Sequence, residues 1–327
     1  MRPFLLSIVA ILLLLPTWSG EERIPLYDGT PDVSVTPVAL VEGEPQRRRV
    51  GALTYLGGVR LKSGDPAFGG FSALAVRGDR VLMLSDFALT FAFTMDGDLR
   101  PRDFAFGALP AGPRGGWSRI DRDSESMAVD PRSGDIWVGF ENANAIWRYA
   151  PGFARPAGFA SPARMADWPK NGGAEAIVRL RSGRFLVFAE SERVEGKPGT
   201  REVLVFDRDP TDPRARSFAF AYRPPARFDP TDAAELPDGR LLVLHRRASV
   251  PAGFTAVLTI LDSRSIAPGA TLSGREIARF EAPVIHDNFE GLAVTREGAS
   301  TIVWIASDNN APTWWQRSLL LKFRLDG

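Results

Sequence analysis

The chain has 327 residues, of which 44% are hydrophobic and 24% are charged, so it has enough apolar residues for a large core and is neither disordered nor fibrous. Its 40 Lys and Arg residues against 39 Asp and Glu residues give a net charge of +1, which gives no sign of nucleic acid or an anionic membrane as a partner. The sequence has no Cys, which excludes disulfides, Cys-bound zinc, iron–sulfur clusters and thiol nucleophiles.

The first predicted element is a signal peptide at residues 1–19. A basic start at Met1 and Arg2 is followed by an apolar run over residues 4–15 and by a breaker and small residues at 16–20. That run is shorter than the roughly 20 residues of a membrane-spanning helix. We therefore expect cleavage near residue 20 and a mature protein that is periplasmic or secreted and makes no membrane contact. Residues 20–49 are expected to form an irregular segment, and residues 50–327 a single domain.

A short phrase recurs along that domain and starts at residues 72, 125, 175, 235 and 290. Its fullest copies are Glu125-Ser-Met-Ala-Val129, Glu175-Ala-Ile-Val178 and Glu290-Gly-Leu-Ala-Val294. A turn signal and a β-rich run follow each copy, at residues 78–84, 134–138, 183–188, 239–244 and 301–305. Third strands are predicted at 89–94, 145–149, 202–207, 255–261 and 318–325, and outer strands at 103–108, 216–223, 275–281 and near Ala157. Each unit therefore corresponds to one four-stranded blade.

The repeat predicts an all-β fold with a single β-propeller. No amphipathic helix of useful length is visible, and 26 Pro and 31 Gly residues supply the many turns that such a fold needs. Five blades are favoured, and a sixth could be contained in residues 22–70. The last repeat ends after its third strand, while residues 50–61 form a spare strand before the first repeat. Pairing of these two segments would close the ring and remove the open sheet edges.

Acidic residues recur at the start of the first strand and at the end of the second strand of the repeats. The first group comprises Asp121, Asp123, Glu125, Glu175, Asp232, Glu235, Asp287 and Glu290, with Asn171 and Asn288 beside them. The second group comprises Asp86, Glu141, Glu190, Glu192 and Asp308, with His245 and Arg246 in the fourth repeat. Equivalent strand ends meet at one mouth of a propeller channel. The pattern favours an oxygen-rich site of the kind that suits calcium, although acids that only cap strand ends would give a similar pattern.

Five stretches of the sequence together carry a resemblance to a known protein family. They are the Glu-x-apolar-Ala contexts of Glu125, Glu175 and Glu290, Asn171-Gly172-Gly173-x-Glu175, Gly239-Arg-Leu-Leu-Val-Leu-His-Arg246, and Asp287-Asn-x-Glu-Gly-Leu-Ala293 with Ser307-Asp-Asn-Asn310. They resemble the phytase-like esterase family of exported bacterial proteins. The resemblance covers roughly residues 50–326 and implies a propeller that hydrolyses phosphate esters. It implies that Glu125, Glu175 and Glu290 are catalytic residues together with Arg246, and that Asp86 and Asp308 join the three glutamates as metal ligands.

Other signals are weaker. Only His245 and His286 could serve a serine–histidine mechanism, and no nucleophile elbow, zinc-protease motif, Walker loop or dinucleotide fingerprint occurs. Arg119, Lys170 and Arg246 flank the predicted strand ends, where they could bind phosphate or simply pair with neighbouring acids. Trp314 and Trp315 could stack on a ring or pack at a blade edge.

The sequence therefore predicts a calcium-assisted phosphoester hydrolase that acts as a monomer on a small-molecule phosphate ester, without nucleic acid or membrane partners. Two alternatives remain open at this point. One is a metal-dependent lactonase or sugar-ester hydrolase, and the other is a binding or scaffold propeller without catalytic activity.

Overall fold

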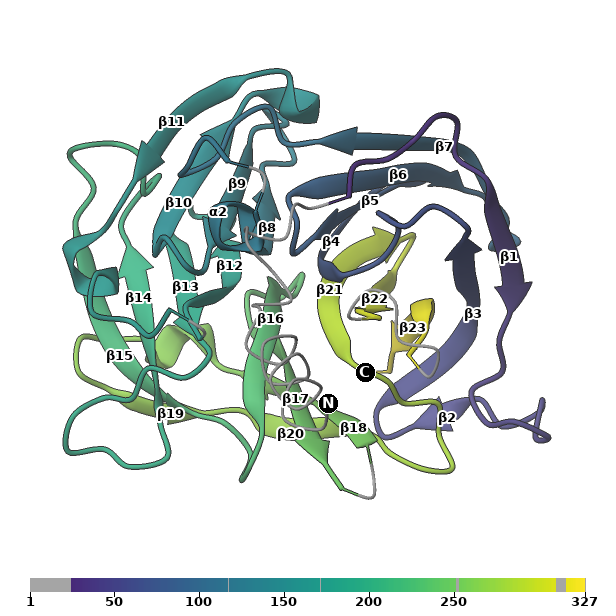
Figure 1. Cartoon of the computed structure of the whole chain (residues 1–327). Helices are drawn as coiled ribbons and strands as arrows, with labels where there is room; N and C mark the ends of the chain where they lie inside the picture. The colour runs from purple at the N-terminus through teal and green to yellow at the C-terminus, as the bar shows by residue number, and fades with distance from the viewer. Residues whose placement is uncertain (1–24, 117, 171, 251–252, 310–315, 327) are drawn as a thin grey trace, which may run out of the picture.

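The computed structural model describes residues 25–116, 118–170, 172–250, 253–309 and 316–326. These residues form five β-sheets arranged around a common axis, as Figure 1 shows, and their strands pair antiparallel except for one short parallel pair. The fold is a five-bladed β-propeller, which confirms the predicted fold class, and the described residues contain no sixth blade. The predicted signal peptide lies outside the described residues.

The first two blades are simple meanders of consecutive strands. The first blade contains β4 (Phe71–Arg77), β5 (Arg80–Ser85), β6 (Leu89–Met95) and β7 (Pro101–Ala108). The second contains β8 (Ser124–Val129), β9 (Ile136–Phe140), β10 (Ala145–Tyr149) and β11 (Pro156–Ala160). Each strand lies within a few residues of the predicted position, because tight turns separate short runs of β-branched and aromatic residues.

The fourth blade contributes one short strand to the sheet of the third blade. The third contains β12 (Ala174–Arg179), β13 (Phe185–Ala189), β14 (Arg201–Phe206) and β15 (Ser217–Arg223). The fourth contains β16 (Asp229–Glu235), β17 (Leu241–Ser249), β18 (Gly253–Leu261) and β20 (Arg275–Phe280). The connection between β18 and β20 carries β19 (Thr271–Ser273), which pairs in parallel with β15 and so ties the two blades together at the rim.

The fifth blade closes the ring with a strand from the N-terminal part of the chain. It contains β21 (Phe289–Glu297), β22 (Ser300–Ser307) and β23 (Ser318–Leu325), and its fourth strand is β3 (Leu53–Ser63). β3 pairs antiparallel with β23 from Leu53 opposite Leu325 to Leu61 opposite Ser318. The predicted closure is therefore confirmed. β1 (Val33–Pro37) and the short β2 (Arg49–Val50) also pair with β3, so the segment expected to be irregular contributes strands to this sheet.

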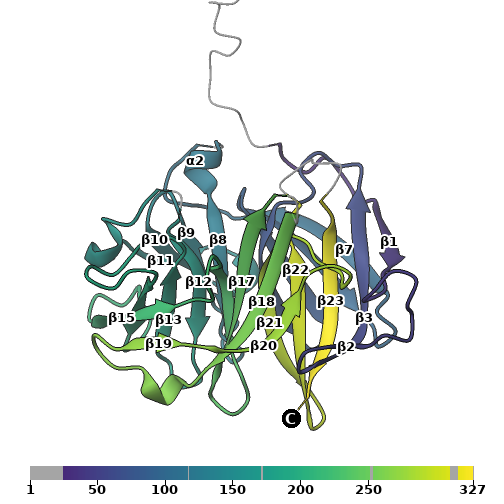
Figure 2. The same cartoon turned by 90° about the horizontal axis from the view of Figure 1, so that it is seen from below.

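The first strand of every blade lines the channel, and neighbouring first strands contact one another around the ring in the order β4, β8, β12, β16, β21. The hydrophobic core lies between adjacent blades, where fully buried side chains such as Phe71, Phe140, Phe188 and Phe280 pack. Helical structure is limited to α2 (Arg119–Arg122) and three 3-10 turns, η1 (Pro151–Phe153), η2 (Ala163–Met165) and η3 (Ser263–Ser265). In the side view of Figure 2, α2 lies at one end face of the propeller.

Every one of the five first strands contains a β-bulge near its start. The register against the second strand shifts once in each blade, and the residues left without a partner are Ser72, Glu125, Glu175, Thr231 and Glu290. A bulge places two residues opposite one and turns a side chain out of the normal alternation. We call these five positions the bulge row. In the fourth blade this row contains Thr231, so the alignment of the repeat on Glu235 was wrong.

No helix among the described residues is both long and apolar enough to cross a membrane.

Candidate functional site

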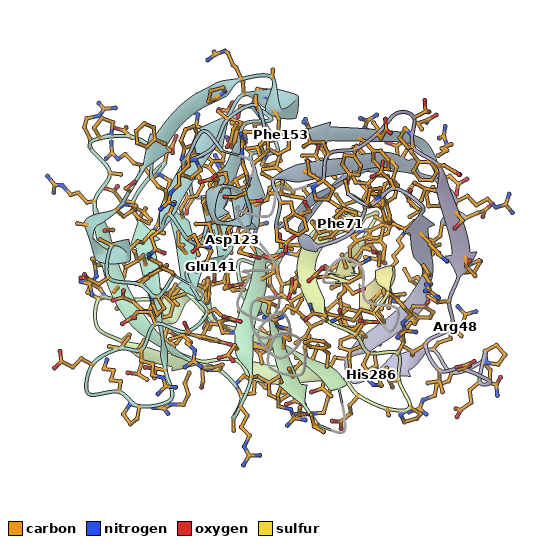
Figure 3. All side chains as sticks on the ribbon, in the orientation of Figure 1. Arg48, Phe71, Asp123, Glu141, Phe153 and His286 are labelled. Atoms are coloured by element: carbon orange, nitrogen blue, oxygen red, sulfur yellow. The ribbon has the colours of Figure 1, made fainter. Side chains whose placement is uncertain are left out.

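A cavity of about 670 Å³ lies at the end of the channel where α2 is found. Its wall is formed by Asp86, Ile120, Asp123, Glu125, Glu141, Asn142, Lys170, Glu175, Glu190, Arg246, Glu290 and Asp308. Carboxylates dominate this wall, and Lys170 and Arg246 are the only cations among the described lining residues. Figure 3 shows two of the carboxylates, Asp123 and Glu141, near the middle of the ring. The arrangement concentrates negative charge in one place and is unlike a strand-capping pattern, in which the acids would be dispersed.

Two rows of equivalent positions build most of this cavity. The first is the bulge row, which contributes Glu125, Glu175 and Glu290. In each second strand, one residue pairs with the first-strand residue that directly precedes the bulge. The second row consists of the residues that come directly after these five in the sequence, namely Asp86, Glu141, Glu190, Arg246 and Asp308. All five members of this second row line the cavity. Each blade repeats the same bulge in its first strand and the same end of its second strand at the channel mouth. The propeller therefore brings together side chains that lie about 50 residues apart in the sequence.

The three glutamates of the bulge row are held in a setting that disfavours their charged form. Burial raises the pKa of Glu125 well above its ordinary value, and repulsion from Glu175 and Asp123 raises it further. Burial likewise raises the pKa of Glu175, with repulsion from Glu190 and Glu141 added. For Glu290 burial again dominates and raises the pKa to about 8, although Arg246 opposes the shift.

Arg246 is the single cation of the second row, and it bridges two carboxylates. Its Nη1 donates to Glu290 Oε1 at 2.6 Å and to Asn288 Oδ1 at 2.9 Å, and its Nη2 donates to Glu190 Oε1 at 3.0 Å. Burial would lower the pKa of Arg246, but the attraction of Glu290 and Glu190 outweighs it and raises the pKa. Arg246 therefore stays charged and fixes one side of the cavity through charge-assisted hydrogen bonds.

Glu141 lies at the centre of the remaining carboxylates. Its Oε1 accepts hydrogen bonds from the backbone N–H groups of Gly172 and Gly173, the latter at 3.2 Å. Burial raises the pKa of Glu141 to about 7, and repulsion from Asp123 adds to the shift. Asp123 in turn accepts a hydrogen bond from Asn142 Nδ2. Glu141 is thus oriented by the backbone, and its contacts within the described part of the chain include no cation.

The donor set fits a hard divalent cation. Ligand oxygens of Asp123, Glu125 and Glu141 lie within 4.8 Å of one another, and so do those of Glu141, Glu175 and Glu190. Calcium accepts six to eight oxygen ligands with loose geometry, and carboxylates are its usual protein ligands. A bound cation would also relieve the mutual repulsion that raises the pKa values of these groups. The cavity can therefore hold a metal ion, and its donor atoms do not identify which one.

Several acids that the sequence pattern grouped with the site lie elsewhere. Asp121 accepts a hydrogen bond from Ser118 Oγ at 2.8 Å within the α2 region. Asp232 accepts the backbone N–H groups of Ala233 at 2.7 Å and Leu292 at 2.6 Å, and so links the fourth and fifth blades. None of these contacts faces the cavity.

The remaining candidates also have structural contacts. Glu235 lies at the far end of β16 and accepts the backbone N–H of Arg181 at 2.7 Å. Asp287 forms an ion pair with Arg317 at 2.9 Å. Asn171, Asn310, Trp314 and Trp315 and the side chain of Arg119 lie outside the described part of the chain.

Neither histidine lines the cavity. His245 is fully buried, where Tyr222 Oη lies 2.8 Å from its Nε2, and burial lowers its pKa to about 4. His286 Nδ1 lies 2.8 Å from the carbonyl oxygen of Val284, and Figure 3 shows this residue away from Asp123 and Glu141. The site therefore contains no histidine base among its described residues.

The sequence analysis grouped Glu141 and Glu190 with Asp86 and Asp308 at the ends of second strands, but it named only Asp86 and Asp308 as metal ligands. All four occupy the same position, directly after β5, β9, β13 and β22. The signal was present, since an acid follows four of the five predicted second strands. What the sequence lacked was the strand pairing that brings these four residues and Arg246 to the wall of one cavity.

Comparisons with known proteins identify the family. A family model described as "Phytase-like: Esterase-like activity of phytase" matches residues 66–311. No curated protein matches the chain. Among solved structures, Myxococcus xanthus glutaminyl cyclase is 10% identical with a TM-score of 0.46 and covers 79% of this chain and 91% of that chain. The Malassezia sympodialis allergen Mala s 1 is 13% identical with a TM-score of 0.43 and covers 85% of this chain and 91% of that one.

Proposed function

This chain belongs to the phytase-like family, and from that premise we propose that it is a hydrolase of phosphate esters whose active site is the acidic cavity. One observation carries the proposal: two rows of equivalent positions, contributed by five blades, direct most of their charged side chains into a single cavity of about 670 Å³. A propeller that used these acids only to cap its strands would have no reason to collect them there. Clefts in which several acids shift one another's pKa values are typical of functional sites.

We assign the metal site to the two carboxylate groups that share Glu141. Asp123 and Glu125 would hold a cation on one side of Glu141, and Glu175 and Glu190 on the other. Asp86 and Asp308 complete the acidic wall beside them. Ca²⁺ suits this all-oxygen donor set, and when bound it would supply positive charge against which a phosphoryl oxygen is polarised.

The chain's own residues would bind the phosphate and move protons. Lys170 lies exposed at the cavity wall, and no ion pair joins it to any residue that the structure describes, so its ammonium group is free to contact phosphate oxygens. Arg246 is held in place by Glu190 and Glu290 and would stabilise negative charge that develops on the phosphoryl group.

The proton transfers fall to the glutamates of the bulge row. One of Glu125, Glu175 and Glu290, in its ionised form, would accept a proton from the water that attacks phosphorus. The water oxygen forms a bond to phosphorus while the phosphorus–oxygen bond to the alcohol breaks, and the leaving oxygen takes up a proton from a second glutamate of the row, which its raised pKa keeps protonated. The products are a free alcohol and a phosphate, or a phosphomonoester when the substrate is a diester.

The decisive experiment is turnover of a panel of phosphomonoesters, phosphodiesters and lactones by the purified protein, with added Ca²⁺ and with a chelator. We expect phosphate ester hydrolysis that depends on the cation. Hydrolysis restricted to lactones would replace phosphoester chemistry by carbonyl chemistry at the same site. Calcium binding without turnover of any ester would show a binding propeller instead.

We also propose that the protein is exported and monomeric, on the strength of the apolar run at residues 4–15 and of the ring that the pairing of β3 with β23 closes within one chain. N-terminal sequencing of the protein from its native host would then start near residue 20. A protein that retains Met1 and stays in the cytoplasm would contradict export.

A further inference from the structure

The peptide that leads into each glutamate of the bulge row is held by a hydroxyl group of the preceding blade. Three such hydrogen bonds are present. Ser72 Oγ donates to the carbonyl of Ser124 at 2.7 Å, Ser126 Oγ to that of Ala174 at 2.6 Å, and Thr231 Oγ1 to that of Phe289 at 3.2 Å. The acceptors are the residues directly before Glu125, Glu175 and Glu290. All three hydroxyl-bearing residues are only 1–2% exposed.

These hydrogen bonds occur at the blade junctions that lead into a glutamate of the bulge row, and not at the other junctions. The other two members of the bulge row are Ser72 and Thr231 themselves, and the residues before them are Phe71 and Pro230. In the described part of the chain, no side chain donates a hydrogen bond to the carbonyl of Phe71 or Pro230. A hydroxyl that served only to join neighbouring blades would be expected at every junction. It is found where a glutamate enters the cavity.

The geometry gives these hydroxyls a mechanical effect on the glutamates. A peptide unit is planar, so a carbonyl that is held in place also fixes the N–H and the Cα of the next residue. The residue in a β-bulge lacks a partner in the ladder and has less to hold it than its neighbours. An external hydrogen bond on the preceding carbonyl therefore sets the direction in which the glutamate side chain leaves the backbone.

We propose that Ser72, Ser126 and Thr231 are positioning residues that aim Glu125, Glu175 and Glu290 into the cavity. The inference rests on the proposed hydrolase function, and it adds that catalysis depends on hydroxyl groups that touch neither substrate nor metal. The second blade shows the arrangement most clearly, because it carries a glutamate in its own bulge and places the hydroxyl for the third blade on the next residue, Ser126.

The test uses the isosteric change Thr231→Val, which removes the hydroxyl but keeps the shape of the side chain. We expect kcat to fall about tenfold with KM within about twofold of the wild type, because a small misplacement of a catalytic group costs rate. Thr231→Ser retains the donor and should restore kcat. Thr255→Val is the matched control, since Thr255 is a buried threonine of the same blade whose Oγ1 has no hydrogen-bond partner among the described residues. It should leave kcat unchanged.

A crystal structure of Thr231→Val gives a readout that needs no substrate. We expect the Glu290 carboxylate to be displaced from its wild-type position, whether or not a phosphate ester is turned over. If the wild type hydrolyses no phosphate ester, the proposed function fails while this displacement still supports the positioning role. An unchanged Glu290, or a kcat that Thr231→Val leaves intact, overturns the inference. Should Thr231→Val not fold, the same measurements on Ser72→Ala and Glu125 decide the question.

Discussion

At the scale of single residues, the cavity is defined by unequal compensation of charge. Arg246 contacts Glu290 and Glu190 at distances of 2.6 and 3.0 Å, while Glu125, Glu141 and Glu175 face mainly other carboxylates. Such a group of acids is costly to keep ionised in a buried site. A bound cation would offset this free-energy cost of keeping the carboxylates ionised. The contribution of each glutamate's charge can therefore be measured with a single Glu→Gln variant.

We expect Glu125→Gln and Glu175→Gln each to reduce phosphate ester turnover by about 100-fold or more, the usual effect of losing a group that transfers a proton or holds a cation. Gln keeps the size of the side chain but removes its charge. The metal-free proteins should be as stable as the wild type or slightly more stable, because one repulsive charge is gone. Glu281→Gln, at an exposed position without a described ion pair, is the control and should have no effect. Full activity in both variants would remove these glutamates from the mechanism.

Lys170→Gln should act on substrate binding. The ammonium group is exposed at the cavity wall, so its loss removes one charge-assisted contact with phosphate. We expect KM to rise about tenfold, equivalent to about 1.4 kcal/mol, with little change in kcat. Steady-state kinetics with a phosphomonoester would measure this, and the effect should be absent for an uncharged lactone. A fall in kcat at constant KM would instead place Lys170 in the chemical step.

The raised pKa values predict how the stability of the metal-free protein depends on pH. Glu141 and Glu290 have pKa values of about 7 and about 8 in the fold, against an ordinary value of 4.5. Between these limits the folded state binds more protons than the unfolded state, so the free energy of unfolding falls as pH rises. Urea unfolding in a chelator should therefore show lower stability at about pH 8 than at about pH 5.5. A metal-free protein that becomes more stable over this interval would contradict the assignment.

At the scale of elements, the β-bulge explains why the strands could be predicted from the sequence while the residues that face the cavity in the fourth blade could not. The repeat, the strand order and the ring closure could be predicted because they depend on turn residues and on β-rich runs. The equivalence of Thr231 with Glu125 could not be predicted from the sequence. A bulge is defined by the pairing of its strand with the next strand, and Thr does not resemble Glu. The fourth repeat was therefore aligned on the acidic residue Glu235, which lies at the other end of β16. Asp232 was misassigned for the same reason.

The closing pair β3 and β23 should contribute strongly to stability. Leu321 of β23 is fully buried between blades, so Leu321→Ala should lower the free energy of unfolding by about 2–5 kcal/mol through lost burial and a cavity. Leu56 lies on β3 but is 37% exposed, and Leu56→Ala should cost far less. Denaturant unfolding of both variants would measure the difference. Equal effects would show that this seam does not hold the ring closed.

At the scale of the whole molecule, the cavity belongs to no single blade. The second row draws one residue from each of the five sheets, so ions and protons at the mouth are coupled to the packing of the entire ring. Calcium should therefore raise global stability and not only local order. At a concentration about a hundredfold above its dissociation constant, linkage predicts a gain of about 2.7 kcal/mol. Thermal unfolding with and without Ca²⁺ would measure it, and an unchanged melting temperature would argue against a calcium site.

The pairing of β3 with β23 also orders events in time. These strands come from opposite ends of the sequence, and a contact of such high sequence separation forms slowly because a long loop must close first. During synthesis the last blade becomes available only after the others have been made. Glu290 and Asp308 belong to that blade. The cavity is therefore among the last parts of the protein to be completed, and a chain interrupted just before β23 would carry every acid that lines the cavity but could not close the ring around it.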